Sequence, residues 1–246
     1  MNVAELYVEE HVGGAPDAPV VVLVHGVFDS CDSFEAVIEH LVPDHTVLTY
    51  DRRGWARSAD ATPATSLGDH ADDLLAVLGG RRATVVGHSY GGTVSFLAAV
   101  RAPDRIAALG LFEPSMQWQP YWPTMDVIAA ESAYEQEHFR HGLEGKPRRT
   151  REERDREQAL LQHELTLIAD EPATPEQLTV PRLVGRGALS AKWRFGTTDH
   201  LRDDLDCELI EIEDAGHTAH RMNPKGFADF VRRAVALGTV ADQGAT

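Results

Sequence analysis

The chain has 246 residues, of which 43% are hydrophobic and 25% charged, and its formal net charge is −16. This composition is typical of a globular domain that can bury a sizeable core, and the negative charge argues against nucleic acid as a partner. Its two cysteines, Cys31 and Cys207, have neither the number nor the spacing of a disulfide framework or a metal site.

The N-terminal residues are polar, and no apolar run in the sequence is long enough to cross a bilayer. We therefore expect no secretory leader and no membrane partner. The sequence predicts a cytoplasmic protein whose partner is a small-molecule substrate.

The first part of the chain alternates apolar strands with amphipathic helices. Residues 6–8 predict a short first strand. The β-branched runs at residues 19–24 and 46–50 predict strands buried on both faces of a parallel sheet. Between them, apolar residues at helical spacing predict a helix that covers residues 34–41.

A second helix is expected after Ser66, which can cap it together with Asp69 three residues later. The glycines at positions 79 and 80 would end this helix. Two further buried strands are predicted, one that ends at residue 88 and one over residues 106–112.

The most informative stretch is residues 84–92, where an apolar strand breaks at Ser89 and an apolar helix follows. Gly87 and Gly91 flank the serine and allow the chain to pass close to its neighbours without Cβ clashes. Such a turn places the Ser89 hydroxyl at a helix N-terminus, where backbone amides favour negative charge.

The alternation of strand and helix stops between residues 115 and 179. Thr150 and Glu153 form a capping-box pattern, and the long helix that they open places Leu161, Leu165 and Ile168 on one side. We interpret residues 115–179 as a helical cap, a place where substrate pockets often form.

The sheet resumes at residues 182–185 and continues with an alternating strand at residues 210–212, and a final helix begins near Pro224. The sequence thus predicts an α/β fold with a mostly parallel sheet of about seven or eight strands and helices on both faces. Residues 1–114 and 180–246 would form this core, and residues 115–179 the inserted cap.

Four motifs in this order resemble those of the α/β-hydrolases: HGVFDS, DRRGWARS, GHSYGG and DAGHTAHRMNP. The resemblance implies Ser89 as the nucleophile and His217, on the loop after the last strand, as its base. His220 is a rival base, but in similar sequences the second histidine packs behind the first. His25 and His88 are expected to orient loops.

The resemblance also implies an oxyanion hole made of two backbone amides. One is expected from Tyr90, directly after the nucleophile. The other should come from the loop that follows His25, with Val27 as the best match and Phe28 as the second choice. Asp51 and Arg53 are expected to brace the neighbouring loops.

The acid of the triad is where the chain departs from the family pattern. The family usually carries an aspartate after the strand at residues 182–185, but this loop has no carboxylate before Asp199. Glu113 follows the preceding sheet strand, and the order Ser89, Glu113, His217 agrees with nucleophile, acid, base. We predict Glu113 as the acid, with Asp199 or no acid as the alternatives.

These residues predict a serine hydrolase that needs no cofactor and no metal and cleaves an ester, thioester or lactone through an acyl-Ser89 intermediate. Because the family's expected aspartate is missing, a lyase, cyclase or acyltransferase stays an alternative, as does a ligand-binding protein on a degenerate hydrolase scaffold. Four aromatic side chains are candidates for an apolar substrate pocket: Phe28, Trp118, Tyr121 and Trp122.

Overall fold

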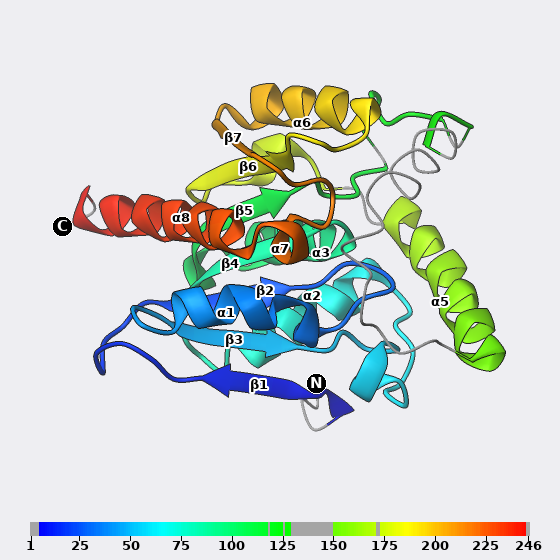
Figure 1. Cartoon of the computed structure of the whole chain (residues 1–246), viewed down its shortest axis with the longest axis horizontal. Helices are drawn as coiled ribbons and strands as arrows, with labels where there is room; N and C mark the ends of the chain where they lie inside the picture. The colour runs from blue at the N-terminus through cyan, green and yellow to red at the C-terminus, as the bar shows by residue number, and fades with distance from the viewer. Residues whose placement is uncertain (1–4, 118, 125, 129–149, 171–172, 245–246) are drawn as a thin grey trace.

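In the part of the chain that the structure describes, seven strands form one sheet in the order β1-β3-β2-β4-β5-β6-β7 (Figure 1). The structure is a computed structural model that describes residues 5–117, 119–124, 126–128, 150–170 and 173–244. The strands are β1 (Val8–His11), β2 (Val20–Val24), β3 (Thr46–Tyr50), β4 (Ala83–His88), β5 (Ile106–Phe112), β6 (Arg182–Gly187) and β7 (Glu208–Ile212).

All neighbouring strands are parallel except β1, which pairs with β3 in the antiparallel direction. The predicted mostly parallel sheet is therefore confirmed. The first strand begins at Val8 and not at residue 6. The amide of Tyr7 donates to Ser58 Oγ at 2.9 Å, so this residue is held by a loop rather than by a regular ladder.

Helices cover both faces of the sheet, because its strands are apolar on both faces. Val21 and Leu23 face one helical layer, whereas Val22 and Val24 face the other, as the period of two in a strand requires. The first layer holds α1 (Glu35–Leu41), α7 (Ala219–Met222) and α8 (Pro224–Gly244); the second holds α2 (Leu67–Val77), α3 (Tyr90–Arg101) and α6 (Lys192–Leu205).

Short 3₁₀ helices complete the described elements: η2 (Cys31–Phe34), η3 (Ala56–Ser58), η4 (Pro103–Arg105) and η6 (Pro175–Gln177). Helix α2 begins with the predicted capping box, in which the Asp69 amide donates to Ser66 Oγ at 3.1 Å. Among the described residues, no helix has both the length and the apolar character that crossing a membrane requires.

One long helix from the predicted cap segment, α5 (Arg151–Asp170), lies beyond the carboxyl ends of the parallel strands (Figure 1). It begins with the predicted capping box, because the Glu153 amide donates to Thr150 Oγ1 at 3.1 Å. Residues 129–149 of the same segment lie outside the described residues. The boundaries 115 and 179 of the cap therefore stay a prediction.

Candidate active site

Ser89 occupies a sharp turn between the end of β4 and the start of α3. Its backbone has φ +54° and ψ −124°, a conformation that L-residues rarely adopt. A Cβ on Gly87 would lie 2.4 Å from Gly91 O, and one on Gly91 would lie 2.2 Å from Val24 O. Both glycines are therefore required for the close packing of this turn, as the sequence predicts.

The Ser89 hydroxyl is buried, and its hydrogen bond runs to Ser115 Oγ at 3.4 Å. Ser115 is held in place because its amide donates to the Ser89 carbonyl at 3.3 Å. Among the described residues, the structure records no hydrogen bond between Ser89 Oγ and His217.

His217 lies on the loop after β7 and is hydrogen-bonded to Glu113, which directly follows β5. His217 Nδ1 lies 2.7 Å from Glu113 Oε2. The other carboxylate oxygen, Oε1, accepts the Gly187 amide at 2.9 Å and the Ser190 hydroxyl at 2.5 Å. Glu113 has φ +44°, so a second strained backbone supports this contact.

Arg194, on α6, places a positive charge beside this pair, with its Nε 3.4 Å from Glu113 Oε2. Burial raises the pKa of Glu113, whereas Arg194 and the hydrogen bonds from Ser190 and Gly187 lower it. Burial and Arg194 both hold the pKa of His217 well below its usual value. His217 is therefore a neutral imidazole at neutral pH.

The protonation of the His217 ring follows from its partner. A carboxylate only accepts hydrogen bonds, so Nδ1 carries the hydrogen and Nε2 keeps a lone pair. His88, next to Ser89, donates from Nε2 to the His217 carbonyl at 2.8 Å, and the two rings lie 4.5 Å apart. The residue beside Ser89 thus holds the backbone of the loop that carries His217.

One predicted amide donor lies in the turn itself, and the other belongs to the loop after His25. Tyr90 is the first residue of α3, so no carbonyl of the helix is available to its amide. The second donor is expected from residues 25–28, which we call the 25–28 loop. A Cβ on Gly26 would lie 3.0 Å from Ser89 Cβ, and Phe28 has φ +56°. The loop before Val27 therefore touches the turn that carries Ser89.

The predicted pocket aromatics fall into two groups. Phe28 packs edge-on against Trp55, with ring centroids 5.6 Å apart. Tyr121 stacks on His200 at 4.8 Å and Trp122 contacts Trp193 at 5.3 Å, and both partners belong to α6. Trp118 lies outside the described residues. A substrate role for these four residues stays a prediction.

The alternative acid lies elsewhere: Asp199, on α6, pairs with Arg186 at 3.0 Å. Asp51 accepts the Cys31 amide at 2.8 Å and the Arg57 side chain, so it joins two loops, as expected. Arg53 likewise forms a two-pronged ion pair with Asp73 of α2.

His220, the rival base, is fully buried and lies 3.3 Å from Asp29. Asp29, His88 and His220 offer three atoms within 4.8 Å of one another that could bind a metal. Arg221 already pairs with Asp29 at 2.5 Å, so a protein cation occupies this carboxylate. Because this ion pair already compensates the charge of Asp29, we assign no metal here.

The sequence analysis did not identify Ser115, Ser190 or Arg194. Ser190 and Arg194 stand in the loop and helix after β6, a region whose sequence shows only that the family's usual aspartate is missing. Ser115 directly follows the Glu-Pro pair that marks the end of β5. Its proximity to Ser89 depends on the pairing of β4 with β5, which no local sequence pattern encodes.

Comparison with known proteins gives one family. The family model described as "alpha/beta hydrolase fold" matches residues 19–188. YraK of Bacillus subtilis, an uncharacterised hydrolase, is 36% identical over 101 residues, which are 39% of this chain and 37% of that protein. RutD of Caulobacter sp. (strain K31), a candidate carbamate hydrolase, is 36% identical over 108 residues, which are 42% of this chain and 40% of that protein.

These matches span about two fifths of the length of the curated relatives. The solved structure of an α/β-hydrolase from Sphaerobacter thermophilus is 25% identical, covers 92% of this chain and 95% of its own, and has a TM-score of 0.66. The matched residues of the family model include most of the sheet together with the Ser89 turn and Glu113. The chain belongs to the α/β-hydrolase fold family.

Proposed function

We propose that the chain is a serine hydrolase that cleaves an ester, thioester or lactone bond of a small apolar substrate. The observation that carries the proposal is the hydrogen bond of 2.7 Å between His217 Nδ1 and Glu113 Oε2, at the loop that packs beside Ser89. It fixes the imidazole tautomer in which Nε2 can accept a proton. A neutral histidine with this tautomer is the general base that a serine nucleophile needs.

In the proposed reaction, Ser89 Oγ attacks the substrate carbonyl carbon while His217 Nε2 takes the hydroxyl proton. The carbonyl oxygen becomes an oxyanion, which the amides of Tyr90 and Val27 would bind. The carbon–leaving-group bond then breaks, and the leaving group takes the proton from His217. Glu113 stabilises the transient imidazolium.

Hydrolysis is completed by water. His217 takes a proton from the water molecule as its oxygen attacks the acyl carbon. The bond to Ser89 Oγ breaks, and this oxygen regains its proton from His217. The product acid leaves, and the enzyme returns to its starting state, so each turnover consumes one water molecule.

The test uses p-nitrophenyl acetate together with a fluorophosphonate probe. The wild-type protein is expected to release p-nitrophenol and to carry the probe on Ser89, and Ser89→Ala should lower kcat at least about 10⁴-fold. Ser115→Ala is the matched control, because it removes a neighbouring hydroxyl but keeps the proposed nucleophile. Turnover that survives in Ser89→Ala at the wild-type rate would contradict the proposal.

The same assay separates the alternatives. Probe labelling at Ser89 without turnover would favour a lyase, cyclase or acyltransferase, whereas neither labelling nor turnover would favour a ligand-binding protein. The resemblance to RutD adds a carbamate as a second substrate class. A p-nitrophenyl carbamate, assayed beside the ester, distinguishes the two by the ratio of their kcat/KM values.

A further inference from the structure

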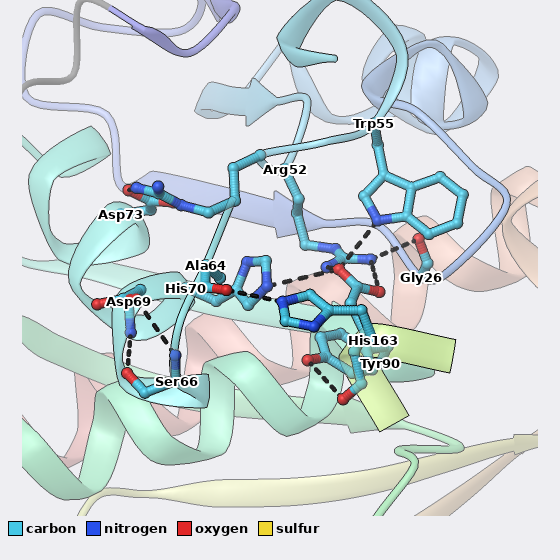
Figure 2. A network of polar contacts seen from close by, with 12 residues as sticks. Gly26, Arg52, Trp55, Ala64, Ser66, Asp69, His70, Asp73, Tyr90 and His163 are labelled. Atoms are coloured by element: carbon cyan, nitrogen blue, oxygen red, sulfur yellow. Dashed lines mark hydrogen bonds and ion pairs between the residues drawn. The ribbon is translucent and has the colours of Figure 1, made fainter. Parts of the chain in front are cut away.

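Arg52 and Glu164 form a fully buried ion pair between the loop after β3 and helix α5. Arg52 Nη1 lies 2.6 Å from Glu164 Oε1 and Nη2 lies 3.3 Å from Oε2, so the pair is two-pronged. Trp55 Nε1 donates to Glu164 Oε1 at 3.0 Å. Figure 2 shows Arg52 in this network, with Trp55, His70 and Tyr90 around it.

The same guanidinium also holds the 25–28 loop. Arg52 Nε donates to the His25 carbonyl at 3.0 Å, and Nη2 donates to the Gly26 carbonyl at 3.2 Å. The backbone amide of Arg52 donates to His25 Nε2 at 2.9 Å. One arginine thus binds a carboxylate of α5 and two carbonyls of the loop.

The protonation of His25 reinforces this arrangement. Because the Arg52 amide is a donor, His25 Nε2 must accept, and the ring hydrogen sits on Nδ1. His25 Nδ1 then donates to the Gly26 carbonyl at 2.7 Å. Burial and the charge of Arg52 lower the pKa of His25 to about 4, which keeps the ring neutral. The Gly26 carbonyl therefore accepts two hydrogen bonds.

The Gly26 carbonyl and the Val27 amide belong to one planar peptide unit, in which they point in opposite directions. Fixing the carbonyl therefore fixes the direction of the N–H group. We propose that Arg52 and Glu164 are positioning residues that couple helix α5 to the orientation of the Val27 amide. The catalytic consequence of this coupling rests on the proposed function, whereas the coupling itself does not.

Glu164 is needed because Arg52 is buried on all sides. A buried guanidinium without a counter-charge is strongly unfavourable, so loss of Glu164 should displace Arg52 toward water or another acceptor. Such a displacement would release the Gly26 carbonyl, even though the side-chain hydrogen bonds of Glu164 run to Arg52 and Trp55. The docking of α5 and the geometry of the amide are thus linked through one side chain.

The neighbouring pair Arg53–Asp73 offers a matched control. It is also two-pronged and largely buried, with side-chain exposures of 12% and 6%. Its arginine follows Arg52 in the same loop, but it binds α2 and the Thr62 carbonyl instead of the 25–28 loop. A general effect of breaking a buried ion pair should therefore appear in both pairs.

The first experiment compares Glu164→Gln with Asp73→Asn by hydrogen exchange of the peptides that contain residues 25–28. Glu164→Gln is expected to speed exchange there about tenfold or more, and Asp73→Asn to leave it unchanged. In the ester assay, Glu164→Gln should lower kcat about 10–100-fold with little change in KM, because a misplaced donor acts on the transition state. Arg52→Lys should do the same, since an ammonium cannot span both partners.

A second variant keeps the test decisive if the single variants fold poorly. Replacing both partners, Arg52→Met with Glu164→Leu, removes the buried charges and should preserve the melting temperature. Faster exchange at residues 25–28 in this folded variant supports the coupling. Unchanged exchange and unchanged kcat overturn it. If the wild-type protein neither hydrolyses the ester nor binds the probe, the proposed function fails, and the exchange data alone decide the coupling.

Discussion

Glu113 is a fully buried carboxylate whose contacts all favour its ionised form. Gly187 and Ser190 donate to one of its oxygens, while His217 and Arg194 lie beside the other. These contacts oppose the effect of burial, which raises the pKa of Glu113. A charged acid at this position can both orient the imidazole and stabilise its protonated form.

Glu113→Gln should lower kcat for p-nitrophenyl acetate about 10³–10⁴-fold, because an amide no longer enforces the productive tautomer of His217. Asp199→Asn is the control, since Asp199 pairs with Arg186. It should keep kcat within about twofold, as surface ion pairs contribute little. The opposite pattern, with Asp199→Asn inactive and Glu113→Gln active, would make our assignment wrong.

Arg194→Met should move the acid limb of kcat/KM to higher pH. The positive charge of Arg194 lowers the pKa of His217, so its removal raises that pKa and protonates the base at higher pH. The measurement is the pH profile of kcat/KM, which reports on the free enzyme. Arg202→Met, which replaces an exposed arginine on the same helix, should leave the pH profile of kcat/KM unchanged. If the acid limb of the Arg194→Met variant stays at the wild-type pH or shifts to lower pH, this role of Arg194 is contradicted.

The sequence predicts the residues that lie in motifs, and it misses those that only tertiary packing brings close. Ser89 and His217 each lie in a recognisable loop, and Glu113 follows a buried strand. Nothing in the local pattern around Arg194 indicates that α6 turns its guanidinium toward that carboxylate. The difference arises because a motif constrains the backbone of one turn, whereas this contact depends on how two elements pack.

At the scale of elements, helix α5 carries a charged residue, Glu164, on its buried face. The sequence pattern places Leu161, Leu165 and Ile168 on one side of this helix. In the structure Ile168 is buried, Leu161 and Leu165 are half-buried, and Glu164 is completely buried. A periodicity count treats glutamate as a solvent-facing residue. It cannot anticipate a buried arginine that compensates the charge.

Helix α2 should lose stability when its N-cap is removed. In Ser66→Ala, the Asp69 amide loses its side-chain acceptor, which should lower the free energy of unfolding by about 1 kcal/mol. Ser66→Asn keeps an acceptor at the same place and should retain most of the stability. Urea unfolding measures both. Equal stability of the alanine and asparagine variants would mean that this cap contributes nothing.

At the scale of the whole molecule, several histidines are buried in neutral form. Burial lowers the pKa of His25 to about 4 and holds the pKa values of His70, His88 and His217 well below the usual one. The unfolded chain binds protons on these side chains at a higher pH than the folded protein does. Stability therefore rises with pH between about 4 and 6.5.

We expect the free energy of unfolding to fall when the pH is lowered from 7 to 5 at constant ionic strength. His25 alone should contribute about 2 kcal/mol to this loss. Glu113, with its raised pKa, acts in the opposite direction but is a single group. Urea titrations at pH 5, 6 and 7 measure the slope. A free energy that stays constant or rises as the pH falls would show that these histidines are not neutral in the folded state.

The overall fold is easier to predict from the sequence than the contacts between individual residues. Alternating strands and helices, with apolar runs in every central strand, suffice to predict a parallel sheet covered on both faces. The antiparallel direction of β1 was not predicted, because strand direction at an edge depends on its neighbour and not on its own residues. The extent of the cap from 115 to 179 has no such signature and stays a prediction.

The hydrogen bond between Glu113 and His217 joins residues that are 104 positions apart in the chain. During synthesis, the Ser89 turn and Glu113 are therefore added to the chain long before His217. Until then the hydroxyl has no base and is a weak nucleophile. On the proposed function, a nascent chain would not react with esters until its last strand has docked and brought His217 into place.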